Sequence, residues 1–464
     1  MNVKPSIVAS TAASDTLEGI SRRVAEAASA IAYGDIPEDV LRTVKLFVVD
    51  TLGVIGGAAR APGIAELGAR LSRWERDGSA TSLVTGRRMS PPHAALANGA
   101  AAHALDFDDM HDPARIHAFC VILPTMLAVA EAIGPVDGKR FLTALTLAAE
   151  MHARFGFACH NSLGVLAGAL GAGRLLDLDG ERMTNALGLT AHQMCGSAQS
   201  MLDGVLSKRL GAGLAARGAV TAAFLAADGL TGPFRALEGN AGLFKLQERG
   251  EVRPEELLSG FGEVWQTRGY SFKPFPCCRC KHTTIALAFG LRERGLRPEQ
   301  VERVDIWLPQ VNWQTVGAPY EAERDSVVHA QFTVAYGFAR ALSDGRVDLS
   351  TYTRPAITDP TIAALAARVF AHADPDEPPT AMGPSRIVVT LADGGILETR
   401  GDIVPGSPEA PMSADEVLGK FRGCMAFGLG LPAGATDDYA RMLLALETLD
   451  DVSAIARSFP AAAA

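Results

Sequence analysis

The sequence predicts a mainly α-helical protein, with a large all-helical domain and a smaller α+β domain inserted before the C-terminal helices. Residues from about 15 to 250 form a succession of helical patterns rich in Ala, Leu and Gly. Strand-like alternation begins after "GFGEVWQTRGYSFKPFPCC", and helical patterns return after "PGSPEAPMS". Because 464 residues exceed one ordinary core, we expect a helical domain over 1–268 plus 406–464 and an α+β domain over 269–405.

The first part of the chain is predicted to pack its helices closely. Segments such as "DVLRTVKLFVVDTLGVIGGAA" and "GVLAGALGAGRLLDL" place small residues at helical spacing, which lets neighbouring helices approach each other. The glycine-rich stretches "GAGLAARG" and "GALGAG" lack the preceding strand that a dinucleotide-binding fingerprint requires. The glycines therefore indicate helix packing rather than a phosphate-binding loop.

The α+β part begins with "VERVDIWLPQV", which alternates as a strand does. Further on, "RIVVTLADGGILETRGDIV" predicts two strands joined by a turn at Asp393, Gly394 and Gly395, and "HTTIALAFGLRERG" and "HAQFTVAYGFARALSDG" predict helices. Ser413 and Glu416 have the spacing of a capping box that starts a new helix. We expect the C-terminal helices to pack back on the first domain, which leaves a cleft between the two domains.

Composition excludes several classes of protein. Hydrophobic residues make up 48% of the chain and charged residues 20%, as in ordinary soluble enzymes. The net charge is −9 and no block of Lys or Arg stands out, so a nucleic-acid partner is not expected. We find neither a secretion signal nor a run of eighteen uncharged apolar residues, and expect no membrane partner. Seven cysteines, an odd number in a long chain, favour a reduced cytoplasmic setting.

The segment "HALDFDDMHDPARIHAF", from His103 to Phe119, carries three histidines, four aspartates and an arginine between two stretches that are predicted to be buried. Burying charge is costly unless the groups are paired or face a water-filled cleft. Two interpretations stay open at this point, a satisfied structural turn and a segment that lines a cleft.

Three other segments concentrate polar groups. "FGFACHNSLG" carries His160, "DGVLSKRLGAG" carries Lys208 and Arg209, and "SFKPFPCCRCKHTT" carries a lysine, an arginine and a histidine around three cysteines. If the segments converge on the cleft, their cations would hold carboxylates and their imidazoles would move protons next to a carboxylate. A small di- or tricarboxylic acid is the substrate class that suits these groups.

Other chemistry is less well supported. "CCRCKH" lacks the two-residue gap of a zinc ribbon, and the sequence has no nucleophile elbow of a Ser-His-Asp hydrolase. Asp108, Asp109 and His111 could hold a divalent ion, but no second carboxylate cluster matches them. We therefore expect no metal site.

The chain resembles the MmgE/PrpD proteins, and the resemblance covers essentially its whole length. The markers are "HALDFDDMH", "KRLGAGLAARGAVTAAFLAADGLTGPFRALEG" and "KPFPCCRCKHTTIALA". Members dehydrate, decarboxylate or epimerise small carboxylic acids, so the resemblance implies an enzyme of one of these types. It also implies an enzyme without metal or other cofactor, a homodimer, and a large helical domain with an α+β lid, which is how we name residues 269–405.

The resemblance assigns catalytic roles residue by residue. Lys208 and Lys273 would hold substrate carboxylates, and Asp106 would orient a histidine or lysine. His117 and His160 would transfer protons, and Tyr336 would donate one. His103, Asp108 and Asp109 are expected to support the loop, and Arg115 to meet a carboxylate or a subunit neighbour.

Four further residues are expected to bind substrate: Met110, Cys278, Arg279 and His282. Met110 stands where the decarboxylase branch has a threonine, and Cys278 where it has a histidine. Cys278 would be an acid or a small filler, and its flanking cations should make the thiol more ionisable. His282 would cap the lid helix or act on substrate.

These departures lead us to expect a dehydratase-type lyase (hydro-lyase) acting on a small polycarboxylate such as 2-methylcitrate. The shared first step is control of a proton on the carbon next to a carboxylate. An epimerase of a small dicarboxylate is the first alternative, and a cis-aconitate-type decarboxylase is the next. A non-catalytic carboxylate-binding protein on the same scaffold is the alternative from another class.

Overall fold

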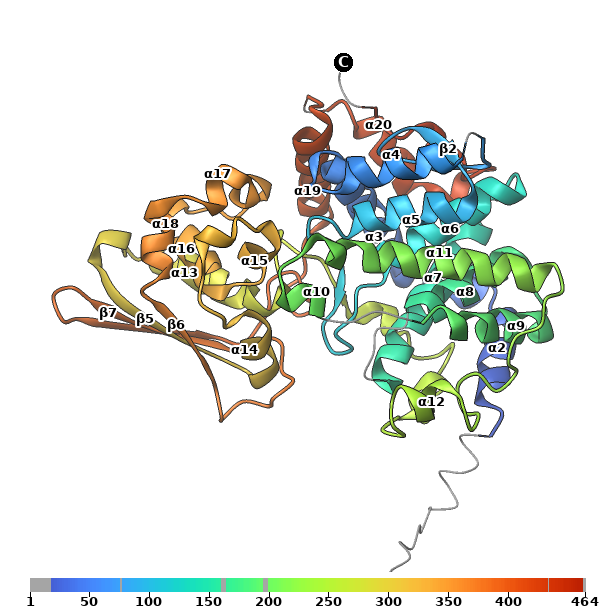
Figure 1. Ribbon diagram of the computed structural model, residues 1–464, viewed down its shortest axis with the longest axis horizontal. Helices are drawn as coiled ribbons and strands as arrows, with labels where there is room; N and C mark the ends of the chain where they lie inside the picture. The colour runs from blue at the N-terminus through green and yellow to red at the C-terminus, as the bar shows by residue number, and fades with distance from the viewer. Residues whose placement is uncertain (1–17, 76, 160–163, 195–198, 433, 462–464) are drawn as a thin grey trace, which may run out of the picture.

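The computed structural model describes residues 18–75, 77–159, 164–194, 199–432 and 434–461. Its two parts lie side by side, a large helical domain and a smaller lid in which helices cover one sheet (Figure 1). The predicted mainly α fold with an inserted α+β part is confirmed.

The helical domain is built from the first half of the chain and the C-terminal segment. Its helices are α2 (Ile20–Ala30), α3 (Glu38–Gly57), α4 (Ile64–Trp74), α5 (Pro91–Ala102), α6 (Phe119–Ile133), α7 (Gly138–Ala158), α8 (Gly164–Leu175), α9 (Gly180–Leu189), α10 (Gln199–Leu202), α11 (Leu210–Ala227), α12 (Leu243–Leu246), α19 (Ala414–Leu429), α20 (Asp437–Leu444) and α21 (Ala454–Arg457). In Figure 1, α11 crosses the front of this domain.

Small residues bring α5 and α11 into backbone contact, as the sequence predicts. A Cβ atom on Gly213 would lie 2.3 Å from the carbonyl oxygen of Leu96, and one on Gly99 would lie 2.8 Å from the Cα of Gly213. Neither distance is possible between real atoms. The crossing therefore requires glycine at both positions, and it holds α11 close to the helix that leads into the charged loop.

The C-terminal helix α19 packs on α3, which confirms that the last helices return to the first domain. Ser413 caps α19 by accepting a hydrogen bond from the backbone N–H of Glu416, and Glu416 closes the predicted capping box in return. This packing carries a lysine of α19, Lys420, into the middle of the helical domain.

The lid is organised around one four-stranded sheet in the order β6-β5-β7-β8, with β5 and β6 parallel and the other pairs antiparallel. Its strands are β5 (Val301–Leu308), β6 (Val369–Ala373), β7 (Ser385–Leu391) and β8 (Ile396–Gly401), and its helices are α13 (His282–Glu293), α14 (Gln310–Val316), α15 (Val327–Gln331), α16 (Val334–Asp344), α17 (Arg354–Ile357) and α18 (Pro360–Ala366). The hairpin predicted around Gly394 is confirmed as β7 and β8. Strand β6 was not predicted, because "VFAHA" is short and carries no clear alternation.

Three short strands lie in the part that the sequence predicts to be all helical. Two of them, β1 (Ala80–Ser82) and β2 (Arg87–Met89), form a hairpin. The third, β3 (Met110–His111), pairs with β4 (Tyr270–Ser271) and so ties the charged loop to the start of the lid segment. After β4 the chain passes from one hydrophobic core to the other. Phe272 belongs to the core of the helical domain, and Cys277 belongs to the core of the lid.

The segment Leu206–Ala227, which contains α11, is the one stretch among the described residues that is long and apolar enough to cross a membrane. It packs against α5, α6, α8 and α9, as a core helix of a helical domain does. Its outer side keeps Leu206, Leu214 and Leu225 exposed.

Gly213→Ala should destabilise the protein by about 1–3 kcal/mol, because the methyl group has no room against α5. Gly211→Ala is the matched control on the same helix, since a Cβ atom there meets nothing within 4 Å. The control should be neutral or stabilising by about 0.5–1 kcal/mol from helix propensity. Thermal unfolding of both variants checks this, and equal melting temperatures would contradict the close crossing.

Candidate active site

The charged loop leaves α5 at His103 and enters α6 at Phe119, and most of its polar side chains are buried. Asp106 and Arg115 adopt left-handed backbone angles, with φ of 52° and 53°. Such angles cost non-glycine residues about 1–3 kcal/mol each, and they persist where surrounding contacts hold them in place. The segment is therefore no solvated surface loop, because most of its charged groups are held inside the protein. Both interpretations, a satisfied structural turn and a segment that lines a cleft, stay open.

Asp106 lies between two lysines from different parts of the chain. Lys208 Nζ, from the turn before α11, is 2.5 Å from Asp106 Oδ1. Lys273 Nζ, from the segment after β4, is 3.4 Å from Oδ2 and donates a hydrogen bond to the Asp106 carbonyl oxygen at 3.0 Å. Although burial opposes ionisation, the two ammonium groups hold the pKa of Asp106 far below its usual range.

The two lysines differ in exposure. The side chain of Lys273 is completely buried, whereas that of Lys208 keeps 13% of its surface and lies 5.0 Å from the ring centroid of Phe332 of the lid. Burial would lower the pKa of Lys273, but Asp106 outweighs it and the pKa is raised. Lys273 is thus a fixed internal cation, and Lys208 is the one that can reach a ligand.

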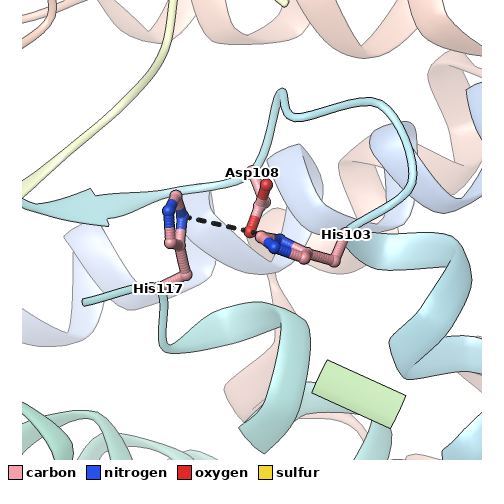
Figure 2. Close-up of side chains that lie close together, drawn as sticks. All are labelled: His103, Asp108 and His117. Atoms are coloured by element: carbon pink, nitrogen blue, oxygen red, sulfur yellow. Dashed lines mark hydrogen bonds and ion pairs between the residues drawn. The ribbon is translucent and has the colours of Figure 1, made fainter. Parts of the chain in front are cut away.

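A second cluster places two histidines on one carboxylate oxygen (Figure 2). His103 Nδ1 lies 2.8 Å from Asp108 Oδ2, and His117 Nδ1 lies 3.3 Å from the same oxygen. The His117 Nδ1 atom also lies 2.6 Å from the carbonyl oxygen of Asp109, an acceptor only. Nδ1 of His117 is therefore the protonated nitrogen, and Nε2 is left to exchange a proton with a ligand.

Burial separates the roles of the two histidines. His103 is enclosed, and burial lowers its pKa to about 4 despite the neighbouring Asp108. The side chain of His117 keeps 26% of its surface, so a small molecule can reach it. Burial opposes ionisation of Asp108 as well, but His103 and His117 keep its pKa well below the usual value.

The candidate ligand atoms of His103, Asp108 and His117 lie within 4.8 Å of one another, close enough for a metal ion. Both Nδ1 atoms, however, already lie within hydrogen-bonding reach of Asp108 Oδ2, which is the arrangement of a proton-carrying histidine oriented by a carboxylate. The alternative set of Asp108, Asp109 and His111 is not brought together. Asp109 accepts hydrogen bonds from the first N–H groups of α6, and His111 faces the carbonyl oxygen of Gln266.

A third lysine supports the loop from the C-terminal segment. Lys420 Nζ donates a hydrogen bond to the carbonyl oxygen of Phe107 at 2.7 Å, lies 4.0 Å from the centroid of its ring, and forms an ion pair with Asp50 of α3 at 2.8 Å. No local pattern singles out Lys420, because it is one of several charged residues in an ordinary helix. It fixes the backbone between Asp106 and Asp108.

Met110 is buried, with 7% of its surface exposed, and belongs to neither hydrophobic cluster. In the pair of β3 and β4, Met110 stands opposite Ser271, whereas His111 stands opposite Tyr270 and contacts its ring. Because side chains alternate along a strand, Met110 shares a face with Ser271 and not with the helical core. It adds an apolar surface at the domain boundary.

Arg279 and His282 are buried at the lid end of the same boundary. Arg279 pairs with Asp112 at 2.8 Å and donates hydrogen bonds to the carbonyl oxygens of Pro405 and Phe272. His282 begins α13 without a side-chain cap, and its Nε2 lies 3.2 Å from the carbonyl oxygen of Cys277. Burial and the neighbouring Arg279 hold the pKa of His282 well below its usual value. The predicted substrate-binding role of both residues stays a prediction.

The prediction that the thiol of Cys278 is more ionisable is wrong. Its pKa is raised well above the usual value, first by the interaction with Cys280 and then by burial. The flanking cations point elsewhere, since Arg279 binds Asp112 and Lys281 donates to the carbonyl oxygens of Ala330 and Thr333. The thiol with the lowered pKa, about 7, is that of Cys280.

Arg115 forms no ion pair with a carboxylate among the described residues, and its expected contact with a subunit neighbour stays a prediction. Its guanidinium reaches into the lid and donates hydrogen bonds to Asn312 Oδ1 at 2.6 Å and to the carbonyl oxygen of Thr380 at 3.2 Å. It therefore fastens the charged loop to the lid, in parallel with the pair of Asp112 and Arg279.

The predicted catalytic residue Tyr336 is not placed at the cluster. The hydroxyl of Tyr336 donates to the carbonyl oxygen of Thr351 at 2.6 Å and accepts from Arg340 inside the lid core. Burial raises its pKa to about 12. A role as proton donor would require this hydroxyl to leave Thr351, and it stays a prediction. His160 lies outside the described residues.

A cavity of about 810 Å³ lies between the domains, as the sequence predicts, and is lined by residues of both, among them Asp112, Trp265, Met382 and Asp402. It reaches Asp112, and also Gln266 and Thr380, the partners of His111 and Arg115, but its lining does not include Asp106 or His117. We therefore place the candidate active site in the region around Asp106 and His117, where ionised groups converge, rather than in this cavity.

Comparisons with known proteins identify the family of the chain. The MmgE/PrpD N-terminal domain matches residues 22–254, and the MmgE/PrpD C-terminal domain matches residues 275–435. The chain belongs to the MmgE/PrpD family. The predicted family is thereby confirmed, and the two matched domains meet near the segment that carries Lys273.

Similar relatives carry one activity in their names. The chain is 26% identical over 483 residues to a cis-aconitate decarboxylase of Aspergillus terreus, which covers 96% of each chain. It is 25% identical to the cis-aconitate decarboxylase of Mus musculus, over 95% of this chain and 93% of the other, and 26% identical to that of Homo sapiens, over 95% and 94%. The family models establish the family, and at these identities the relatives leave the reaction to be argued from the site.

His103 should make the protein less stable in acid. Its folded pKa of about 4 lies below the ordinary value near 6.5, so between these pH values the unfolded chain binds one proton more. His103→Gln should therefore weaken the loss of stability between pH 6.5 and 4 by about 1.4 kcal/mol per pH unit. Urea unfolding at several pH values measures it, with His372→Gln on the lid strand β6 as control. An unchanged slope in His103→Gln would contradict a buried neutral imidazole.

Proposed function

We propose that this protein is a lyase that removes carbon dioxide from a small unsaturated tricarboxylate of the cis-aconitate type. The similar relatives named above are cis-aconitate decarboxylases, and they support this alternative better than our first expectation of a dehydratase. The observation that carries the proposal is that the charged loop brings together two accessible groups. Its Asp106 binds the carboxylate-binding lysine, Lys208, and the loop itself carries the proton-carrying histidine, His117.

Decarboxylation of such a substrate needs a place for the electron pair of the breaking carbon–carbon bond. When the lost carboxylate is allylic, this pair forms a new double bond to the neighbouring carbon. The electron pair of the old double bond moves to its far carbon, which takes up one proton. A cation that binds a remaining carboxylate stabilises the developing negative charge, and a protonated imidazole can supply the proton.

The chain's own residues match these requirements. Lys208 has donors beyond the one that faces Asp106 and would bind a substrate carboxylate. His117 would deliver the proton from Nε2 while Asp108 and the carbonyl oxygen of Asp109 hold Nδ1. Lys273 is fully buried, so we assign it to the fixation of Asp106 rather than to substrate, in contrast to the expected role of both lysines.

Dehydration remains the second candidate because of Met110. A buried apolar side chain at the domain boundary suits a substrate with a methyl branch, as 2-methylcitrate has, better than one with only polar groups. Dehydration would use the same histidine to remove a proton next to a carboxylate.

Turnover in deuterated water separates the reactions. The purified protein is incubated with cis-aconitate, citrate and 2-methylcitrate, and NMR follows the products. We expect carbon dioxide and a methylene-substituted succinate with one solvent deuterium from cis-aconitate. An alkene formed from 2-methylcitrate without carbon dioxide would favour dehydration, and a melting shift without turnover would favour a binding protein.

Two substitutions test the assigned residues. His117→Asn should lower kcat by about 10²–10⁴, the usual contribution of acid–base assistance. Lys208→Met should lower kcat/KM by about 10–100-fold through loss of a charge-assisted contact. Lys139→Met, an exposed lysine on α7, is the control for removing a lysine charge. Near-normal turnover in both site variants would remove these residues from the mechanism.

A further inference from the structure

Two cysteines of the lid lie one residue apart in the sequence, beside the charged loop. Cys278 and Cys280 precede α13 in the sequence Cys-Arg-Cys, and each is the main cause of the shift in the other's pKa. Arg115 Nη2, which comes from the loop of the helical domain, lies 3.7 Å from Cys280 Sγ. A guanidinium next to a thiol favours the thiolate, which is the reactive form.

Cys280 differs from the other described cysteines in this respect. Burial raises the pKa of Cys159 and of Cys424 to about 12, and it also raises the pKa of Cys120 and Cys277. For Cys280 the interaction with Cys278, followed by the charge of Arg115, outweighs burial and the opposing charge of Asp112.

The pair also keeps some exposure. Cys278 and Cys280 have 7% and 8% of their surface accessible, whereas Cys277 has none. A reagent as small as hydrogen peroxide needs little access. The two residues are close enough in the chain for their Cα atoms to fall within the 4.4–6.8 Å that disulfides span.

Both cysteines are connected to the candidate active site. The backbone N–H of Cys278 donates to the carbonyl oxygen of Gln331, and the Gln331 side chain donates to the carbonyl oxygen of Leu105, next to Asp106. At the other end, Arg115 joins Cys280 to the loop through its own guanidinium. A covalent change in the pair would therefore reach the loop from two directions.

We propose that Cys278 and Cys280 form a peroxide-responsive dithiol, whose oxidation to a disulfide displaces the charged loop and stops turnover. The Cys280 thiolate attacks one oxygen of hydrogen peroxide, so that an S–O bond forms, the O–O bond breaks and a sulfenic acid and hydroxide result. The Cys278 sulfur then attacks the sulfenic sulfur, the S–S bond forms and the S–O bond breaks. Two thiols and one peroxide thus yield one disulfide and two waters, and a thiol reductant reverses the change.

The disulfide removes the free thiol that accepts a hydrogen bond from Arg115. The guanidinium then keeps Asn312 and the carbonyl oxygen of Thr380 as its partners. The ring closed by two cysteines with one residue between them is small, and strained disulfides of this kind are readily reduced. Reversibility is therefore a property that the geometry implies.

The experiment uses the full chain and hydrogen peroxide, and its first readout does not depend on the substrate. Mass spectrometry should show a loss of 2 Da, mapped to one peptide with Cys278 joined to Cys280. Its rate should rise about tenfold from pH 6 to pH 8 and then level off, as expected for a thiol pKa of about 7. Dithiothreitol should restore the mass.

Variants identify the attacking thiol. Cys280→Ser should abolish the 2 Da loss, and Arg115→Met should slow it severalfold. Cys424→Ser, in α19, is the control that should oxidise as the unchanged protein does. A disulfide to another cysteine, oxidation of Cys280→Ser at the normal rate, or no mass change under peroxide would each overturn the proposal. Turnover of cis-aconitate, followed in parallel, should fall with the fraction of disulfide and recover with reduction, and activity retained in the fully oxidised protein would refute the regulatory part.

Discussion

The structure depends on neutralising carboxylates that the loop from His103 to Phe119 carries into the protein interior. Asp106 and Asp108 are both buried, and an unpaired ionised carboxylate there would cost several kcal/mol. Lys208 before α11 and Lys273 after β4 pair with Asp106, and His103 and His117 lie on Asp108. Lys273 also binds the carbonyl oxygen of Asp106, and Lys420 of α19, which pairs with Asp50, binds the carbonyl oxygen of Phe107. Neighbouring contacts thus provide both the charge compensation and the shape of the loop.

This requirement explains why the chain folds as it does around the loop. The C-terminal helices return to the first domain, and one of them delivers Lys420. The lid segment starts by pairing β4 with β3, and it delivers Lys273 two residues later. Side chains that are fully enclosed hold the loop in place, whereas side chains at the edge of the cluster remain accessible to a ligand. His117 and Lys208 are the two residues at that edge.

Much of this could be predicted from the sequence. Helical periodicity, the hairpin turn at Gly394 and the capping box of Ser413 are local signals, and the structure confirms them. The density of charge between apolar helices was enough to single out the loop. Long-range partners could not be predicted, because nothing near Lys420 or Arg115 in the sequence says which element each side chain will meet. The thiol chemistry was assigned to Cys278 on the basis of neighbours in sequence, and the neighbours in space favour Cys280. The predicted homodimer, the cytoplasmic location and the absence of a metal or other cofactor stay predictions.

A crystal structure of the protein with a bound unreactive tricarboxylate tests the central claim most directly. The account predicts one ligand carboxylate on Lys208 Nζ and a ligand carbon or carboxylate within reach of His117 Nε2, with Asp106 still held by Lys273. A ligand that occupies the cavity between Asp112 and Asp402, with His117 and Lys208 untouched, would contradict it.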